Sequence, residues 1–251
     1  MSASTSSLPL TRRAQNRQAM IGEIKALARR QLAEKGPGAL SLRAIAREMR
    51  TASSALYRYF ASYDELISAL CADAYGSVAD AVTAARDTQP AGDHARRWQA
   101  VCHAYRRWAL DNRSDFALIF GTPVPGYQAP SAVTGPGASR FTAVPLEVYA
   151  AAARAGAADP DRTQVPQDIE AGELLRDLLA EATPDYPPRL AAIVLNAWAS
   201  LLGYLAAEIF GSLSRLVSDT DQLYVAHVHT VMLGMGFDPA RIDAADTRRG
   251  R

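Results

Sequence analysis

Side chains that can hydrogen-bond to a nucleic acid are concentrated between Leu40 and Leu70, in the run LSLRAIAREMRTASSALYRYFASYDELISAL. The four small residues at positions 52–55 would make a helix tip slim enough to enter a DNA major groove, which is about 12 Å wide. Serine hydroxyls can read base edges there, and tyrosine phenols can donate to phosphate oxygens. The stretch therefore predicts a contact with double-stranded DNA.

Enzymatic or metal chemistry finds little support in the rest of the chain. The histidines are His94, His103, His227 and His229. They lack the spacing of a metal site, since residues two apart on a helix point to different sides. No nucleophile elbow, P-loop or dinucleotide-binding glycine motif occurs, and Cys71 and Cys102 are too few for a disulfide framework. We therefore expect no enzyme, catalytic residue, cofactor or metal ion.

The charge of the chain is unevenly distributed. Residues 1–70 carry 11 Lys and Arg against 5 Asp and Glu, whereas residues 71–251 carry 16 against 21. A basic front end on an acidic remainder favours a polyanionic partner for the front end. Chance clustering of basic side chains explains the charge alone equally well. Residues 1–16 are rich in Ser and Thr and are predicted to be a mobile tail, and Arg12, Arg13 and Arg17 at or just beyond its end are expected to be able to contact phosphate.

Hydrophobic periodicity places the polar run on short helices. It predicts a helix from Gln18 that Gly36 ends, and Ser41 is a good N-cap for a second helix. Residues 50–52 interrupt the pattern before a third helix, and a capping box at Ser62 begins a fourth. The apolar residues expected to lock these helices together are Leu42, Ile45, Ala46, Met49, Leu56 and Phe60.

Beyond Pro90 the pattern remains helical. The ranges predicted as helices are about 93–110, 114–120, 141–155, 170–181, 188–211 and 219–235. Residues 121–139 hold four prolines and four glycines and, like residues 156–168, are predicted to be irregular. No segment alternates as a strand would. The expected fold class is all-α, with an N-terminal three-helix helix-turn-helix domain and a larger helical bundle.

Residues 190–207 carry no charge over eighteen positions, which is the threshold length for a membrane-spanning helix. The run is rich in alanine and is interrupted by Asn196, Ser200 and Gly203. A helix that is apolar all round also suits a position between its own core and a partner subunit. We therefore expect a buried interface and no membrane, and the absence of a leader pattern leads us to expect a cytoplasmic protein.

Three short motifs carry a resemblance to a known family. The runs A-I-A-R-E-M, A-L-Y-R-Y-F and D-E-L, within about Gln18–Tyr75, resemble the DNA-binding domain of TetR-type transcriptional regulators. The run from Tyr105 to Tyr127 is similar to the regulatory domain of one subgroup, whose C-terminal helix typically reads Trp, three residues, His, Gly. This chain has Leu202 in the place of that histidine, after Trp198.

The resemblance implies a homodimer that binds a pseudo-palindromic DNA operator, represses transcription and is released by a small-molecule effector. The last two helices of each subunit would pair in a four-helix interface. The implied domains are a disordered tail (1–16), a helix-turn-helix DNA-binding domain (17–77), a ligand-binding and dimerisation domain (78–240) and a C-terminal tail (241–251). The alternative is a helical ligand-binding or protein-interaction module that has lost its DNA affinity.

The resemblance also assigns the DNA contacts. The implied DNA-binding residues are Arg43, Arg50, Thr51, Ser53, Ser54, Ala55, Tyr57, Tyr59 and Tyr63. Arg50 occupies a position where the family usually has glycine, so we expect a positive φ at a cost of about 1 kcal/mol. Ala52 replaces the usual serine N-cap and cannot cap, which leaves Thr51 or Ser53 as alternative caps that would shift the helix start.

Aromatic residues in the larger domain suggest a cavity. The set is Trp98, Tyr105, Trp108, Phe116, Phe120, Tyr127 and Trp198. Ligand cavities between helices are commonly lined by aromatic side chains, but the same spacing also suits a plain packed core. Residues 121–139 would then be either a lid over this cavity or a surface loop.

Overall fold

The computed structural model describes residues 11–36, 40–121, 126–170, 172, 176 and 187–242. These residues are helical with no strand, which confirms the all-α fold class. The chain divides into an N-terminal unit, residues 1–70 with 123–128, and a C-terminal unit, residues 71–122 with 129–251. The predicted helix at 170–181 lies almost wholly outside the described residues.

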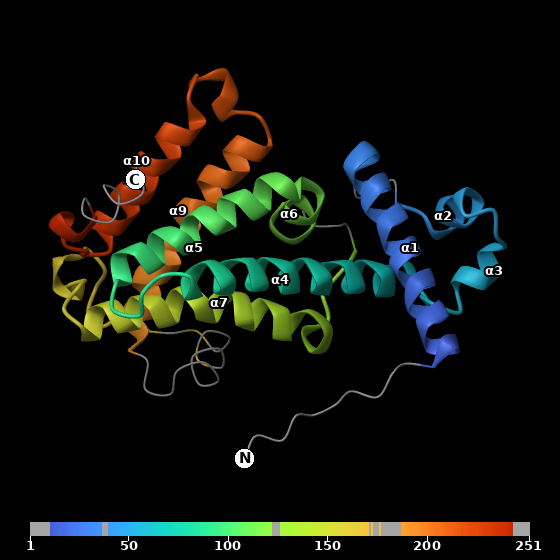
Figure 1. Ribbon diagram of the computed structural model, residues 1–251, viewed down its shortest axis with the longest axis horizontal. Helices are drawn as coiled ribbons and strands as arrows, with labels where there is room; N and C mark the ends of the chain where they lie inside the picture. The colour runs from blue at the N-terminus through green and yellow to red at the C-terminus, as the bar shows by residue number, and fades with distance from the viewer. Residues whose placement is uncertain are drawn as a thin grey trace, which may run out of the picture. The chain divides into compact units, whose positions relative to one another are not determined.

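The N-terminal unit is built from short helices on one long helix (Figure 1). Its helices are α1 (Arg12–Lys35), α2 (Leu42–Glu48) and α3 (Ser53–Leu56), followed by the start of α4 (Tyr63–Asp87). The residues predicted to lock them together are buried, except for half-buried Met49. Gly36 ends α1 with a φ of 74°, a conformation that glycine adopts without strain.

The first helix begins earlier than predicted. Residues 12–16 were expected in a disordered tail, and the structure instead starts α1 at Arg12. The Oγ1 of Thr11 caps the helix by accepting a hydrogen bond from the Ala14 N–H at 3.3 Å. Arginine is also a good helix former. The composition of residues 1–16 suggested a tail because their few apolar residues cannot form a core, but a cap and helix-forming side chains are sufficient to start a helix here.

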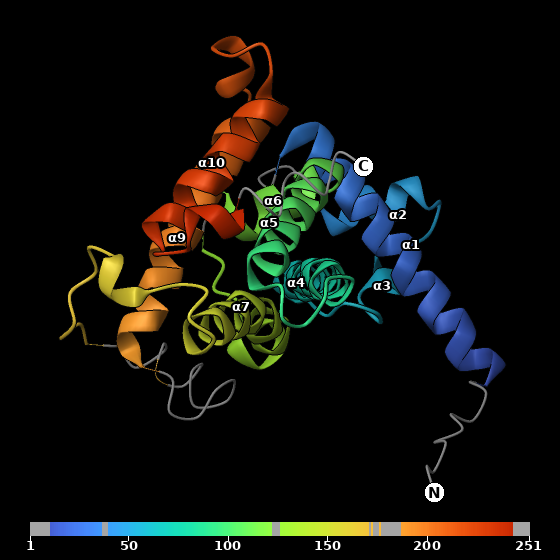
Figure 2. The same cartoon turned by 60° about the vertical axis from the view of Figure 1, so that its left-hand side comes forward.

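The C-terminal unit packs its long helices around one hydrophobic core (Figure 2). It contains α4 from residue 71 onward, and its other helices are α5 (His94–Asp111), α6 (Arg113–Phe120), α7 (Ser131–Arg154), α9 (Pro188–Ile209) and α10 (Thr220–Gly234), with 3-10 turns η2 (Pro160–Arg162) and η3 (Leu213–Arg215). Helix α5 packs against α7 and α9, and α10 packs against α9. An isolated β-bridge joins Ala158 to Phe237.

Helix α7 corrects the prediction that residues 121–139 are irregular. The helix starts at Ser131 and continues through Pro136 and Gly137. Proline removes one helical hydrogen bond, and the packing of this segment overrides that local cost. A Cβ on Gly137 would lie 2.8 Å from the Cβ of Tyr75 in α4, so the glycine permits a close approach of the two backbones. Residues 131–139 are therefore neither a lid nor a loop.

A buried ion pair ties α5 to α9. The Arg106 guanidinium donates to both carboxylate oxygens of Glu208, at 2.8 and 2.5 Å, and also reaches Asp221 at 2.7 Å. The guanidinium carbon lies 4.9 Å from the centroid of the Tyr224 ring. The Tyr224 hydroxyl in turn donates to the Cys102 carbonyl at 2.7 Å, which fixes α10 to α5.

Helix α9 is, among the described residues, the one helix long and apolar enough by composition to cross a membrane. In its most apolar window, 44% of the residues are buried inside the chain. Core helices of water-soluble proteins also meet these criteria, so length and composition do not assign α9 to a membrane.

Candidate nucleic-acid interface

The end of α2 positions the turn between the two short helices. Ser41 caps the start of α2 by accepting from the Ala44 N–H at 3.4 Å, as its sequence position predicted. At the other end the Arg50 N–H bonds to the Arg47 carbonyl at 3.1 Å, and the Thr51 N–H bonds to the carbonyl of residue 46 at 3.0 Å. These two bonds form a Schellman motif, which ends a helix with one residue in the left-handed conformation.

Arg50 is the residue held in that left-handed conformation. Its φ is 53°, which confirms the expectation of a positive φ at this position. A side chain in this conformation costs about 1–2 kcal/mol relative to glycine. The turn thus keeps its geometry with an arginine, and the long side chain is exposed at the junction of α2 and α3.

Helix α3 starts without a side-chain cap. It begins at Ser53, and Ala52 occupies the N-cap position with extended backbone angles and no side-chain hydrogen bond. The alternative in which Thr51 or Ser53 caps the helix and shifts its start is therefore wrong. The turn fixes the backbone of residue 52 in the cap conformation, whatever its side chain.

The predicted contact residues lie around this turn with different exposures. Those that are exposed are Arg43, Arg50, Thr51, Ser54 and Tyr57. Those that are half-buried are Ser53, Ala55, Tyr59 and Tyr63. Tyr57 exposes 47% of its surface, whereas its neighbour Leu56 exposes 1%. A large aromatic side chain beside a buried anchor is suited to contact a partner rather than to support the core.

The beginning of α1 adds arginines to this surface. The Arg17 guanidinium donates to the Arg58 carbonyl at 3.3 Å and lies over the Tyr59 ring, 5.2 Å from its centroid. An open hollow of about 560 Å³ is lined by Arg12, Arg13, Asn16, Arg17, Arg58 and Tyr59. No acidic side chain lines it, so this surface offers several cationic groups to phosphates. The sequence indicated Arg12, Arg13 and Arg17 as phosphate contacts, but it did not indicate that they share a surface with Arg58.

Tyr63 is the first residue of α4, where a capping network fixes the chain. The Glu65 N–H donates to Ser62 Oγ at 3.0 Å, and the Glu65 carboxylate accepts from the Ala61 N–H at 2.5 Å. Burial, with a smaller contribution from the Asp64 carboxylate, raises the pKa of the Tyr63 phenol. Tyr63 therefore remains a neutral hydroxyl that can donate to an anion.

The aromatic set predicted to line a pocket is only partly brought together. Trp98, Tyr105 and Trp198 line one small cavity of about 20 Å³ in the C-terminal unit. Phe116 and Phe120 pack against Tyr105, with ring centroids 6.5 and 6.1 Å away.

The two remaining members of the set lie elsewhere. Trp108 is outside the cavity lining and donates its indole N–H to Ser77 Oγ at 3.0 Å. Tyr127 belongs to the N-terminal unit, where its hydroxyl lies 3.0 Å from Ser68 Oγ. Sequence spacing could not separate these residues from the three that share the cavity.

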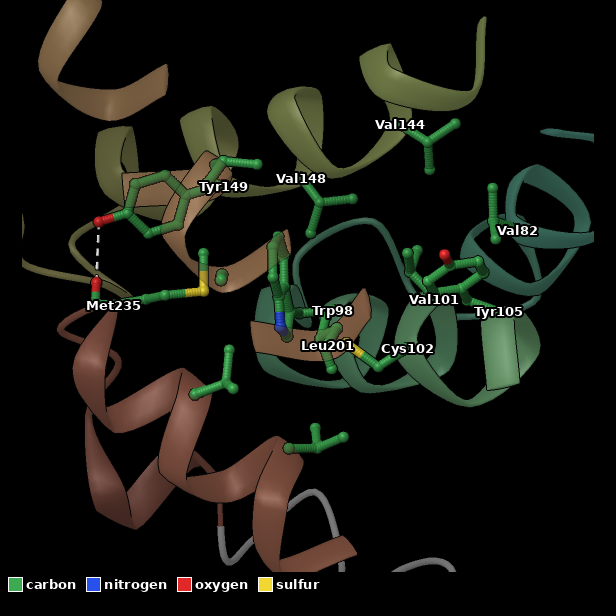
Figure 3. Packing of buried hydrophobic residues seen from close by; sticks show 14 of the residues in the cluster. Val82, Trp98, Val101, Cys102, Tyr105, Val144, Val148, Tyr149, Leu201 and Met235 are labelled. Atoms are coloured by element: carbon green, nitrogen blue, oxygen red, sulfur yellow. Dashed lines mark hydrogen bonds between the residues drawn. The ribbon is translucent and has the colours of Figure 1, made fainter. Parts of the chain in front are cut away.

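The cavity is completed by residues that the sequence did not single out. These are Val101, Cys102, Phe141, Pro145, Val194 and Leu201. Figure 3 shows Trp98, Val101, Cys102, Tyr105 and Leu201 close together in this core. Burial raises the pKa of the Cys102 thiol and of the Tyr105 phenol, so both remain protonated. Apolar residues recur at the same helical spacing along the sequence whether they line a cavity or fill a core, so the sequence gives no signal that would have identified these residues as cavity lining.

Comparisons with known proteins agree with both units. Residues 24–70 match the family described as bacterial regulatory proteins, tetR family, and residues 98–231 match the tetracyclin repressor-like C-terminal domain. The HTH-type transcriptional regulator Rv1816 of Mycobacterium tuberculosis is 36% identical over 196 residues, which cover 78% of this chain and 82% of that protein.

Solved structures share the fold. The regulatory protein SCO4313 is 33% identical, with a TM-score of 0.69 over 88% of this chain and 99% of that one. RolR, in a crystal structure with its ligand resorcinol, has a TM-score of 0.50 over 94% of this chain and 96% of that one. At 16% identity, RolR is similar in fold alone.

Proposed function

The chain belongs to the TetR family of transcriptional regulators, and from that membership we propose that it is a homodimeric repressor released from its DNA operator by a small molecule. It is a DNA-binding regulator with a helix-turn-helix rather than an enzyme. In our proposal the DNA-binding domain extends from the start of α1 to about residue 77, and residues 78–240 bind the effector and the second subunit.

The observation that carries the proposal is the polar, basic surface around the turn from α2 to α3. Arg43 on α2, Arg50 in the turn and Ser54 on α3 are exposed, as is Tyr57 directly after α3. The arginine-lined hollow of α1 includes Arg58 and Tyr59, the next residues along the chain. In this arrangement the tip of α3 reads base edges while phenols and guanidinium groups bind phosphates. Two-fold symmetry would then place two such tips in successive major grooves, about 34–36 Å apart.

The exposed faces of α9 and α10 support the homodimer. On α9 this face holds Leu195, Asn196, Ala199, Ser200 and Gly203, and on α10 it holds Gln222, Ala226, Thr230 and Leu233. None of these side chains is charged, and most are small enough for close helix packing. We propose that the two helices of each subunit pair with their symmetry mates in a four-helix interface.

Release by a small molecule is supported by the cavity among α5, α7 and α9. RolR shares the fold and binds resorcinol, a small aromatic compound, in its crystal structure. An effector that binds better to a dimer with wrongly spaced DNA-binding units would shift the population away from the DNA-bound form.

The test is the selection of bound sites from random duplex DNA by the full chain, followed by gel shifts at stated salt concentrations. Tyr57→Phe should weaken binding to all sequences alike, by about tenfold, because it removes a phosphate contact. Ser54→Ala should instead change the preferred base pairs, an effect of about 1–3 kcal/mol per pair.

Salt dependence gives a separate measurement with a matched control. Arg17→Ala should lower the slope of log affinity against log salt by about 1. Arg215→Ala removes an exposed arginine in the C-terminal unit and should leave the slope unchanged. If the wild-type chain binds no duplex DNA even at low salt, the repressor proposal is wrong. The alternative, a helical ligand-binding or protein-interaction module that has lost its DNA affinity, would then be the better explanation.

A further inference from the structure

Helix α3 is too short to be stable through its own hydrogen bonds. It spans only Ser53–Leu56, and a single helical turn gains too few hydrogen bonds to offset the cost of forming it. No side chain caps its start, where Ala52 occupies the N-cap position. Its inner side is anchored by Leu56 and Phe60, which expose 1% and 4% of their surface. The rest of the helix depends on support from other elements.

Helix α1 supplies that support at the C-terminal end of α3. The helical turn continues to Phe60, because the N–H groups of Tyr59 and Phe60 both bond to the Leu56 carbonyl, at 2.8 and 3.0 Å. The carbonyls at the end of a helix have no partner within it. The Arg17 guanidinium donates to one of them, the Arg58 carbonyl, at 3.3 Å. A cation at this end of a helix is also favoured by the helix dipole.

The same guanidinium contacts the ring of the next residue. Its central carbon lies 5.2 Å from the centroid of the Tyr59 ring, within the range of a cation–π contact. Arg17 therefore holds two successive residues, Arg58 by its carbonyl and Tyr59 by its ring. A flat guanidinium with five N–H groups can make both contacts and still donate to a phosphate. A lysine ammonium carries the same charge but lacks the flat face and the fork of donors.

The other arginines at the start of α1 differ from Arg17 in this respect. Arg12 and Arg13 line the same hollow and are exposed. Within the part of the chain that the structure describes, no hydrogen bond joins either of them to the turn after α3. A phosphate contact alone accounts for these two arginines, whereas the contacts of Arg17 with Arg58 and Tyr59 exist without DNA.

We propose that Arg17 is a positioning residue that holds the end of α3 against α1 in the free chain, so that the base preference of α3 depends on an arginine that contacts no base. The inference rests on the proposed function because it concerns how that regulator reads its operator. A helix that is already ordered loses less conformational freedom on binding, which raises the affinity for sites that α3 reads. Duplex DNA of unrelated sequence is bound through its phosphates and gains little from an ordered α3.

Gel shifts of the full chain on the selected site and on duplex DNA of unrelated sequence test this role. Arg17→Lys keeps the charge, so the slope of log affinity against log salt should not change. The ratio of the two affinities should fall by about 3- to 10-fold for each subunit, the range for one exposed hydrogen bond with a cation–π contact. A phosphate contact alone would leave the ratio unchanged, and partial unfolding would lower both affinities equally. Either result would overturn the proposal.

Three further variants isolate the contacts of Arg17. Arg13→Lys is the matched control in the same hollow and should leave the affinity ratio unchanged. Tyr59→Phe keeps the ring under the guanidinium and should also keep the ratio of the wild-type chain. Tyr59→Leu removes the ring and should lower the ratio as Arg17→Lys does. Equal ratios for the two Tyr59 variants would contradict the proposed positioning.

Hydrogen exchange of the free chain separates this inference from the repressor proposal. The amides of Tyr59 and Phe60 should exchange about 3- to 10-fold faster in Arg17→Lys, while the Met49 amide at the end of α2 should not change. Unchanged exchange at the turn would overturn the positioning role. A chain with faster exchange that binds no duplex DNA refutes only the repressor, and a chain that binds DNA with an unchanged affinity ratio refutes only the positioning role.

Discussion

The buried ion pair between Arg106 and Glu208 allows a quantitative test of how the C-terminal unit is held together. The side chains expose 11% and 7% of their surface, and two hydrogen bonds join them. Arg106→Met removes the partner of a buried carboxylate, a loss that typically costs about 3–5 kcal/mol. Glu208→Gln should cost less, about 1–3 kcal/mol, because Arg106 retains Asp221 and the face of the Tyr224 ring.

The assay is urea unfolding followed by helical circular dichroism at one fixed protein concentration. The two changes together, Arg106→Met with Glu208→Leu, should cost much less than the sum of the single costs, because no buried charge is left unpaired. Arg107→Met is the matched control, since this neighbouring arginine is exposed, and it should change stability by no more than about 0.5 kcal/mol.

The pH dependence of Arg106→Met distinguishes a buried charge from lost packing. An unpaired buried carboxylate takes up a proton more readily than an exposed one, and its neutral form is cheaper to bury. The folded variant then binds more protons than the unfolded chain, so its stability deficit should shrink between pH 7.5 and pH 5. Equal costs for the two single changes, or a deficit that stays constant with pH, would refute the ion-pair explanation.

Two further predictions concern backbone geometry and use the same unfolding assay. Ala52→Ser should stabilise the chain by about 1 kcal/mol, because position 52 already has the backbone angles of an N-cap and lacks only a side-chain oxygen to accept a hydrogen bond from the start of α3. An unchanged free energy of unfolding would show that a capping hydrogen bond adds nothing to the stability of this helix start. Gly137→Ala should destabilise by about 1–3 kcal/mol, because its Cβ would meet Tyr75 at 2.8 Å. Gly135→Ala, in the same helix with nothing within 4 Å, should instead stabilise by about 1 kcal/mol, and the same sign for both would contradict the packing argument.

Much of the DNA-binding unit followed from local sequence. Ser41 was identified as an N-cap and Leu56 as a buried anchor, and the structure confirms both. The positive φ of Arg50, which the structure also confirms, was implied by the resemblance to the family and not by the local pattern. The first two features depend on residues within a few positions of one another, since capping and helix periodicity are near-neighbour effects. For this reason the all-α class and the order of the helices could also be predicted.

Only the tertiary structure decided where α7 begins and which aromatic residues share a cavity. Pro136 breaks a helix by local rules, yet α7 contains it, next to the close approach of Gly137 to Tyr75. Trp98 and Trp198 are a hundred positions apart and line one cavity with Tyr105. The sequence determined which side chains are apolar and which segments are helical. The packing of distant helices determined which of those side chains meet, because such contacts depend on the relative positions of whole helices and not on spacing along the chain.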